Sequence, residues 1–345
     1  MNPKIVSIYS GAGGLDLGFH EAGFETVYAT DIWDIACQTL SQNFKKTKVE
    51  CKSIADIDFY NVKEHFTQID GLIGGPPCPP FSKSRFYRTE KERGINDEDG
   101  YITITNYFRA VKELNPTFFL FENVHGFVYK PHQAALEYLV TESDKLGYEI
   151  TYRVINTANY GIPQTRERFI CVGVKKGLRK FEFPAETHAE IPSNNMIKPW
   201  RTAGEVLTDM DFELPEDSKM EAGSKHKYLL KLVPPGDNYL YFTQERGYPN
   251  PVFKWRSRYW SFLLKLSPDR PSWTIQASHS NNMGPSHWKN RFLRILEIKR
   301  LQTFDDEYSL AGSFRDQWRQ VGNAVPPQMA NILAHQIKAL YFKNN

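Results

Sequence analysis

A proline-rich loop that carries a single cysteine constrains this chain more than any other feature. Residues 69–73 form a short apolar run typical of a buried strand, and residues 76–80 then read Pro-Pro-Cys-Pro-Pro. Proline fixes φ and cannot continue a central strand or a helix interior. The sequence therefore predicts a stiff loop that holds the thiol of Cys78 just past the carboxyl end of a strand, where ligands bind in open α/β sheets.

Cys78 has two interpretations in this position. A thiolate held at a fixed point is a nucleophile, although its ordinary pKa of about 8.5 must be lowered by its surroundings. The alternative is a small hydrophobic side chain in a proline-rich turn, which is the commoner role of a single cysteine. The four cysteines show no CxxC spacing, which argues against a disulfide framework and a zinc site, so we expect a reducing compartment and no metal.

Length and composition indicate a two-lobed protein. The chain has 345 residues, of which 41% are hydrophobic, enough for one large core and a smaller one. The first residues run directly into a strand-like segment instead of a signal peptide, and no apolar stretch reaches transmembrane length. We therefore expect a cytoplasmic protein with no membrane partner.

The first 31 residues read as the opening of a nucleotide-binding fold. An apolar run at 4–9 is followed by the glycine-rich segment 10–14 and then by a helical pattern, which is the order strand, glycine turn, helix. The dinucleotide fingerprint is absent, because Asp16 stands where its third glycine would be. Asp31 ends the next strand 20 residues after Gly11, where a carboxylate grips a ribose diol, although an N-cap for the following helix explains it equally well.

Two further segments place chemically capable side chains at strand ends. Residues 117–121 are apolar throughout, as in the centre of a parallel sheet, and Glu122 follows them directly. Burial there would raise the pKa of the carboxyl group and suit a proton donor, although a satisfied polar group is the simpler interpretation. Arg166 and Arg168 share one face of an extended segment, where they could bind one target together or form ordinary ion pairs.

The charged segment 83–100 predicts a loop bordering the site. Basic residues outnumber acidic ones among residues 83–93, as a lid closing over phosphates would require, and Gly94 and Gly100 interrupt the segment. A plain surface loop would look similar. Residues 101–114 then repeat apolar side chains at helical spacing, which predicts an amphipathic helix.

The strand and helix alternation is lost from about residue 184 and resumes at 291. We therefore predict a catalytic domain of residues 1–184 and 291–345 and a second, irregular domain of residues 185–290. Within it, the stretch 246–289 holds seven basic residues and one acidic residue, interleaved with aromatic side chains. This pattern is typical of nucleic-acid contact, and a solvated face over an aromatic core is the alternative.

Six motifs, taken together and in order, resemble those of the DNA (cytosine-5) methyltransferases of bacterial restriction-modification systems along nearly the whole chain. They are S-G-x-G-G at 10–14, P-C-x-x-F-S at 77–82, E-N-V at 122–124, Q-x-R-x-R at 164–168, R-L-Q-x-F at 300–304 and G-N-A-V-P-P at 322–327. The insert between Arg168 and Arg291 falls where that family keeps its target-recognition domain. The resemblance implies a Rossmann-like α/β fold that binds S-adenosylmethionine and releases S-adenosylhomocysteine.

The family's mechanism assigns a role to each candidate catalytic residue. Cys78 would attack C6 of a flipped-out cytosine, and Glu122 would donate a proton to N3. Arg166 would hold the cytosine O2 and the Glu122 carboxylate, and Arg168 would help to organise the site. The enamine formed in this way takes the methyl group at C5, after which the C5 proton is removed and Cys78 leaves.

The resemblance also implies a cofactor site and a DNA-contacting surface. The expected cofactor-binding residues are Tyr9, Ser10, Gly11, Ala12, Gly13, Gly14, Asp31, Ile32, Ser53, Pro76, Asn323 and Ala324, with Asp56 in place of Ser53 if the register slips. The expected DNA-contacting residues are Ser82, Lys83, Arg85, Gln164, Arg246, Lys254, Arg256 and Arg258. The sequence departs from the family at Pro79, where glutamine is usual, and at Tyr9, where phenylalanine is usual.

Double-stranded DNA is thus the expected partner, in a nucleoid-associated monomer, with a cognate restriction endonuclease acting separately. A tRNA cytosine-C5 methyltransferase shares most of these motifs and is the nearest alternative. A catalytically silent DNA-binding relative is a second alternative, which the presence of Cys78, Glu122 and Arg166 disfavours. The missing third glycine excludes a nicotinamide oxidoreductase.

Overall fold

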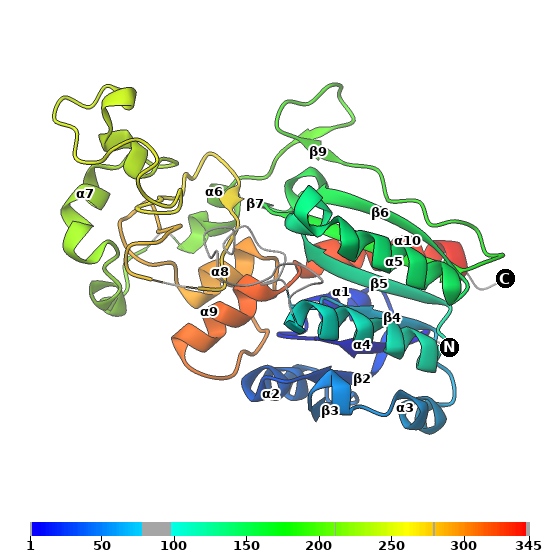
Figure 1. The fold of residues 1–345 in the computed structure, drawn as a ribbon. Helices are drawn as coiled ribbons and strands as arrows, with labels where there is room; N and C mark the ends of the chain where they lie inside the picture. The colour runs from blue at the N-terminus through cyan, green and yellow to red at the C-terminus, as the bar shows by residue number, and fades with distance from the viewer. Residues whose placement is uncertain (1, 78–97, 211, 279, 343–345) are drawn as a thin grey trace.

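A seven-stranded sheet between two layers of helices forms the larger part of the computed structural model, which describes residues 2–77, 98–210, 212–278 and 280–342 (Figure 1). The strand order is β3-β2-β1-β4-β5-β8-β6; the first five strands are parallel, and β8 runs antiparallel to both of its neighbours. The strands are β1 (Lys4–Ile8), β2 (Glu25–Asp31), β3 (Lys48–Cys51), β4 (Gly71–Gly74), β5 (Phe118–Val124), β6 (Tyr148–Asn156) and β8 (Glu167–Lys175).

The apolar run predicted as a central strand is β5, and its alternation builds the core on both faces of the sheet. Phe119 and Phe121 belong to one apolar cluster, together with side chains of α3, α4 and α5. Phe118 and Leu120 belong to the cluster on the opposite face, together with side chains of α1 and α10. Successive side chains of a strand point to opposite faces, so a strand covered on both sides must be apolar throughout.

Helices cover the two faces in separate sets. The helices of this domain are α1 (Gly14–Glu21), α2 (Asp34–Asn43), α3 (Phe59–Phe66), α4 (Glu98–Leu114), α5 (Gln133–Lys145), α8 (Ile295–Leu301), α9 (Phe314–Asn323) and α10 (Pro327–Tyr341). In Figure 1, α4 and α5 lie in front of the sheet while α1 and α10 lie behind it, and the two chain termini meet at one end. A Cβ on Gly18 of α1 would lie 2.3 Å from the Pro327 carbonyl, so glycine is what lets α10 return this closely.

Between β8 and α8 the chain is largely irregular, as predicted for residues 185–290. Its regular elements are β9 (His188–Ala189), β10 (Lys198–Pro199), α6 (Ala203–Leu207), α7 (Lys227–Leu232) and β11 (Ser272–Trp273). A separate small core, built around Leu229, Tyr239 and Phe242, holds part of this region together. β11 pairs with β7 (Gln164–Thr165) and so ties the region to the larger domain. The exact domain boundaries stay a prediction.

Two element boundaries differ from the prediction. β5 continues through Glu122 to Val124 because β8 pairs with it along that length, so Glu122 lies within the strand, opposite Ile170. α4 begins at Glu98, and the last three residues of the predicted loop 83–100 are therefore helical. In the part of the chain that the structure describes, no helix combines the length and apolar character needed to cross a membrane.

Asp16 is an unexpected buried charge in the first turn of α1. Its side chain is fully buried, and Ser7 Oγ donates a hydrogen bond of 3.0 Å to its Oδ2, while its Oδ1 accepts none among the described residues. Burial raises the pKa of this carboxyl group from its ordinary 3.8 to about 6. Folding therefore holds a proton on Asp16 more tightly than the unfolded chain does, and the ionised form destabilises the fold.

This buried carboxyl group predicts a pH-dependent stability. Between pH 4 and pH 6 the native state binds more protons than the unfolded state, so the free energy of unfolding falls as the pH rises. Asp16→Asn removes that loss, and we expect the variant to be about 2–3 kcal/mol more stable than wild type at pH 7.5 and about equal to it at pH 4. Urea denaturation at both pH values measures the difference; equal stability at pH 7.5 would contradict the prediction.

Candidate functional site

A glycine turn forms one wall of the candidate site, between β1 and α1. Tyr9, Gly11 and Gly13 adopt positive φ angles of 53°, 53° and 76°, which turn the chain sharply at the end of β1. A Cβ on Gly14 would lie 2.2 Å from the Val325 carbonyl, so the segment after α9 backs directly onto this turn. Among the described residues, a Cβ on Gly11 would meet no atom within 4 Å, which leaves space on that side of the turn.

Asp31 ends β2 beside the same turn. Its Oδ2 accepts a hydrogen bond of 2.8 Å from the Gly11 backbone amide, and its Oδ1 accepts one of 2.9 Å from the Trp33 amide. Burial raises the pKa of this carboxyl group, and the amide donors partly oppose that shift. A carboxylate offers about four acceptor positions, so Asp31 keeps capacity for a diol after these two bonds. Ile32, the next residue, is 74% exposed.

The other predicted cofactor residues lie at the same edge of the sheet. The Tyr9 hydroxyl, which needed a partner, donates to the Thr103 carbonyl at 2.9 Å. Ser53 lies two residues past β3 and caps a short 3₁₀ helix, Ile54–Asp56. Pro76 lies two residues past β4, where its carbonyl accepts a hydrogen bond of 3.2 Å from the Asn123 side chain. Ala324 approaches the turn, since a Cβ on Gly14 would lie 3.1 Å from its own Cβ.

These residues fit S-adenosylmethionine. Space beside Gly11 admits a ligand close to the backbone, and Asp31 offers free acceptors for ribose hydroxyls. The carboxyl ends of parallel strands gather there, which is where this class of sheet binds nucleotides. Among the residues that the structure describes, no group of three His, Cys, Asp or Glu side chains is arranged to hold a metal ion.

Glu122 lies near the end of β5, beside the chain that leaves β4 toward the proline-rich loop. Its side chain is only 6% exposed, and Arg168 Nε forms an ion pair with its Oε1 at 2.9 Å. Burial raises the pKa of this carboxyl group, while the neighbouring Arg168 and Arg166 oppose the shift. A Cβ on Gly75 would lie 2.6 Å from Glu122 Oε2, so the chain passes the carboxylate closely as it leaves β4. Cys78 follows three residues later and lies outside the described residues.

The contacts of Arg166 and Arg168 differ from those that were predicted. The ion pair with Glu122 that was predicted for Arg166 is made by Arg168. Arg166 is 1% exposed, and its guanidinium donates to the carbonyls of Ile275 at 3.1 Å, Gly322 at 2.8 Å and Ala324 at 2.9 Å. Arg166 lies between β7 and β8, and Arg168 lies within β8. Arg166 thus joins its own strand region to two segments that are distant in the sequence.

Gln164 is buried completely, which is incompatible with its predicted DNA contact. Its amide nitrogen donates to the Leu301 carbonyl at 3.2 Å and to the Gln302 side chain at 2.5 Å. Its amide oxygen accepts from the Ile275 backbone amide at 3.2 Å. Gln164 therefore joins β7 to α8 and, through Ile275, to the end of the smaller domain.

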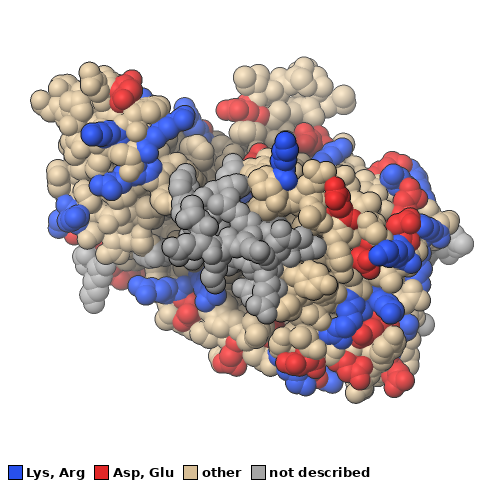
Figure 2. Space-filling view, viewed as in Figure 1, with Lys and Arg blue, Asp and Glu red and all other residues tan. Residues whose placement is uncertain are grey.

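The predicted DNA-contacting residues of the smaller domain lie on an exposed basic and aromatic surface. In Figure 2, the charged side chains on the face of this domain turned toward the viewer, at the left, are mostly Lys and Arg, set among uncharged residues. Arg256 stacks over the Trp255 ring at 5.8 Å, and Lys254 is exposed beside it. Arg258 lies 5.9 Å over the Phe262 ring. Arg246 is already paired with Asp237 at 2.5 Å, so it is the least available of the four predicted residues.

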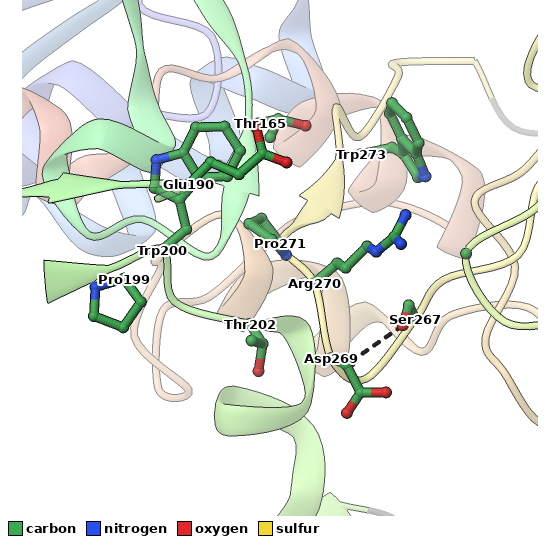
Figure 3. A pocket seen from close by; sticks show the side chains of 11 residues that line it. Thr165, Glu190, Pro199, Trp200, Thr202, Ser267, Asp269, Arg270, Pro271 and Trp273 are labelled. Carbon is green, nitrogen blue, oxygen red and sulfur yellow. Dashed lines mark hydrogen bonds between the residues drawn. The ribbon is translucent and has the colours of Figure 1, made fainter. Parts of the chain in front are cut away.

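The exposed aromatic side chains continue into a pocket at the boundary of the two domains. Trp260 and Trp273 lie with ring centroids 5.5 Å apart, and both are about two-fifths exposed. Trp273 and Arg270 extend in the same direction along one side of a pocket of about 560 Å³, with Trp200 and Glu190 across from them (Figure 3). Ser82, Lys83 and Arg85, which were also predicted to contact DNA, lie outside the described residues.

Sequence reasoning missed a contact beside the cofactor turn. The Arg319 guanidinium of α9 lies 4.4 Å over the indole of Trp33, and its charge partly opposes the rise that burial causes in the pKa of Asp31. Trp33 precedes α2 and Arg319 is nearly 300 residues away, so only the fold brings them together. No spacing or motif in the sequence indicates this pair.

Comparisons with known proteins agree on one family. The model of the family "C-5 cytosine-specific DNA methylase" matches residues 3–339. The type II methyltransferase M.SacI of Streptomyces achromogenes is 37% identical over 96% of this chain and 92% of its own length. The type II methyltransferase M.NgoFVII of Neisseria gonorrhoeae is 32% identical over 99% and 88%. In the fold comparison, the S. pombe Dnmt2 methyltransferase superposes with a TM-score of 0.66 at 15% identity, covering 99% of this chain and 98% of its own.

The Arg166 contacts predict a mainly structural effect of substitution. Arg166→Lys cannot reproduce a planar fork that reaches three carbonyls, and each buried acceptor left unmet costs about 1–3 kcal/mol. We expect the free energy of unfolding to fall by about 3 kcal/mol or more in urea denaturation. Arg168→Lys, which keeps a charge near the buried Glu122, is the matched control and should lose clearly less stability. Equal losses in both variants would refute the division of roles.

Proposed function

Because this chain belongs to the C-5 cytosine-specific DNA methylase family, we propose that it transfers the methyl group of S-adenosylmethionine to C5 of a cytosine within a specific duplex DNA sequence. The chain is a DNA cytosine-5 methyltransferase; the cofactor, the covalent route and the residues that carry it are the proposal. A stacked base cannot offer its ring face to a thiolate, so the target cytosine is flipped out of the duplex.

Cys78 is the proposed nucleophile. Its sulfur attacks C6 of the flipped cytosine, which places a pair of electrons on the ring and makes C5 nucleophilic. The support lies in the chain that leads to it: the loop leaves β4 at Gly74, passes the Glu122 carboxylate at Gly75, and has its Pro76 carbonyl held by Asn123. Those contacts fix where the loop starts.

Glu122 is the proposed acid that assists this attack. C6 accepts a thiolate readily only when N3 of the ring is protonated or strongly hydrogen-bonded, and a carboxyl group must keep its proton to donate it. Burial raises the pKa of Glu122, so this carboxyl group holds its proton to higher pH than an exposed glutamate does. Arg168 holds the carboxyl group in place through the 2.9 Å ion pair, and it is now the better candidate to reach the cytosine O2.

The cofactor site is assigned to the turn between β1 and α1. S-adenosylmethionine supplies an electrophilic methyl group. Asp31 orients the ribose through its free acceptor positions, and the backbone around Gly11 approaches the methionine part. Ile32 offers an exposed apolar side chain for the adenine, and Ala324 closes the site from the C-terminal side.

The buried pair of Glu122 and Arg168 beside the root of the cysteine loop is the observation that carries the proposal. The Glu122 side chain is only 6% exposed, so its carboxyl group needs a partner, which is Arg168. Burial still raises the pKa of Glu122 with Arg168 beside it. The relatives are named type II methyltransferases, so we also propose a monomer whose methylation protects sites from a separate endonuclease of the same specificity.

Transfer of labelled methyl groups to unmethylated duplex DNA, followed by mapping of the modified cytosines, tests the substrate and the product together. We expect 5-methylcytosine at one defined sequence and no transfer by Cys78→Ala. Incorporation into tRNA but not duplex DNA would overturn the substrate, and retained transfer by Cys78→Ala would overturn the nucleophile.

Glu122→Gln predicts a loss that is confined to the chemical step. Glutamine keeps the shape of the side chain but cannot donate the proton, so we expect kcat to fall by about 10²- to 10⁴-fold with DNA binding unchanged. In wild type, kcat should decline as the pH rises through the raised pKa of Glu122, since the deprotonated carboxylate is no longer an acid. Single-turnover rates across pH measure both; a variant that keeps the wild-type rate and pH profile would rule out the role.

A further inference from the structure

Asp16 lies directly beneath the proposed cofactor turn and is connected to it. Its Oδ2 accepts from Ser7 Oγ at 3.0 Å, and that hydroxyl lies 2.8 Å from the hydroxyl of Ser10, the first residue of the turn. Tyr308 comes from the C-terminal part of the chain, and its hydroxyl donates to the Ala12 carbonyl at 2.5 Å. Asp16 therefore belongs to the framework that shapes the turn.

The charge of Asp16 has no counterpart of opposite sign in the part of the chain that the structure describes. No Lys, Arg or His among those residues pairs with it, and the side chains that oppose the effect of burial on its pKa are the Ser7 and Thr26 hydroxyls. The start of α1 offers partial positive charge and Ser7 a hydrogen bond. These do not offset burial, because the pKa of the group is raised to about 6. At pH 7.5 most molecules therefore carry an uncompensated buried anion.

An uncompensated anion weakens the fold, and such features persist where function uses them. The proposed reaction brings one cation to this turn, since S-adenosylmethionine carries a positive sulfonium. The charge disappears when the methyl group leaves, because S-adenosylhomocysteine is a neutral thioether at that atom. An anion beneath the turn would thus hold the cofactor more strongly than the product.

We propose that Asp16 is a positioning residue whose buried charge makes the cofactor turn select the sulfonium form of the ligand over the neutral product. This inference rests on the function proposed above. It acts through the field of the carboxylate, with no contact between Asp16 and the reacting atoms. Methyl transfer then removes the attraction and favours release of the product.

Calorimetric binding at pH 7.5 tests the selectivity with three ligands: S-adenosylmethionine, S-adenosylhomocysteine, and an analogue in which an amine-bearing carbon replaces the methylated sulfur. Unit charges about 10 Å apart in a partly screened interior change affinity roughly tenfold. We expect Asp16→Asn to weaken both cationic ligands about tenfold and to leave S-adenosylhomocysteine within about twofold of wild type.

Ser7→Ala is the matched control, because it cuts the link to Ser10 while keeping the Asp16 charge. It should change the affinities of all three ligands by similar factors. If Asp16→Asn weakens all three ligands equally, the residue only braces the turn and the inference fails. It fails as well if the variant changes none of them. Wild-type protein that binds none of the three ligands would instead overturn the proposed cofactor, which separates the two failures.

Discussion

The interaction on which the rest of the structure depends is the set of hydrogen bonds made by the Arg166 guanidinium. It joins the strand region that precedes Arg168 to the end of the smaller domain at Ile275 and to the C-terminal end of α9 at Gly322 and Ala324. Those segments lie more than 100 residues from Arg166 in the chain. A chain whose catalytic domain is interrupted by a long insert needs such a fastening, because both parts must be in place before the site exists.

The sheet supplies the common edge to which the functional residues are attached. Asp31 ends β2, Pro76 follows β4, and Glu122 lies near the end of β5. Parallel strands bring their carboxyl ends to one side, so residues far apart in sequence meet there without long loops. The antiparallel strand β8 then brings Arg168 against Glu122 from the opposite direction, in the register where Val124 faces Arg168.

Sequence periodicity predicted the sheet well, because the strands are covered on both faces and their apolar runs are unambiguous. The centre of β5 lies where its apolar run placed it. The roles of Arg166 and Arg168 could not be predicted, because the carbonyls that Arg166 reaches and the Glu122 carboxylate that pairs with Arg168 come from segments distant in the sequence. The burial of Gln164 and the Arg319 contact with Trp33 depend on segments that only tertiary packing brings close. In the sequence, Asp16 shows only that the dinucleotide fingerprint is absent. Its burial beneath the turn is visible only in the fold.

The account stands on a reversible bond between the sulfur of Cys78 and C6 of cytosine, and trapping that bond tests it most directly. Duplex DNA in which 5-fluorocytosine replaces the target cytosine cannot lose a proton from C5, so the protein stays attached after methyl transfer. Mass spectrometry of the denatured complex, formed with S-adenosylmethionine present, should find the adduct on the peptide that contains Cys78. An absence of any adduct, or attachment through another residue, would contradict the mechanism.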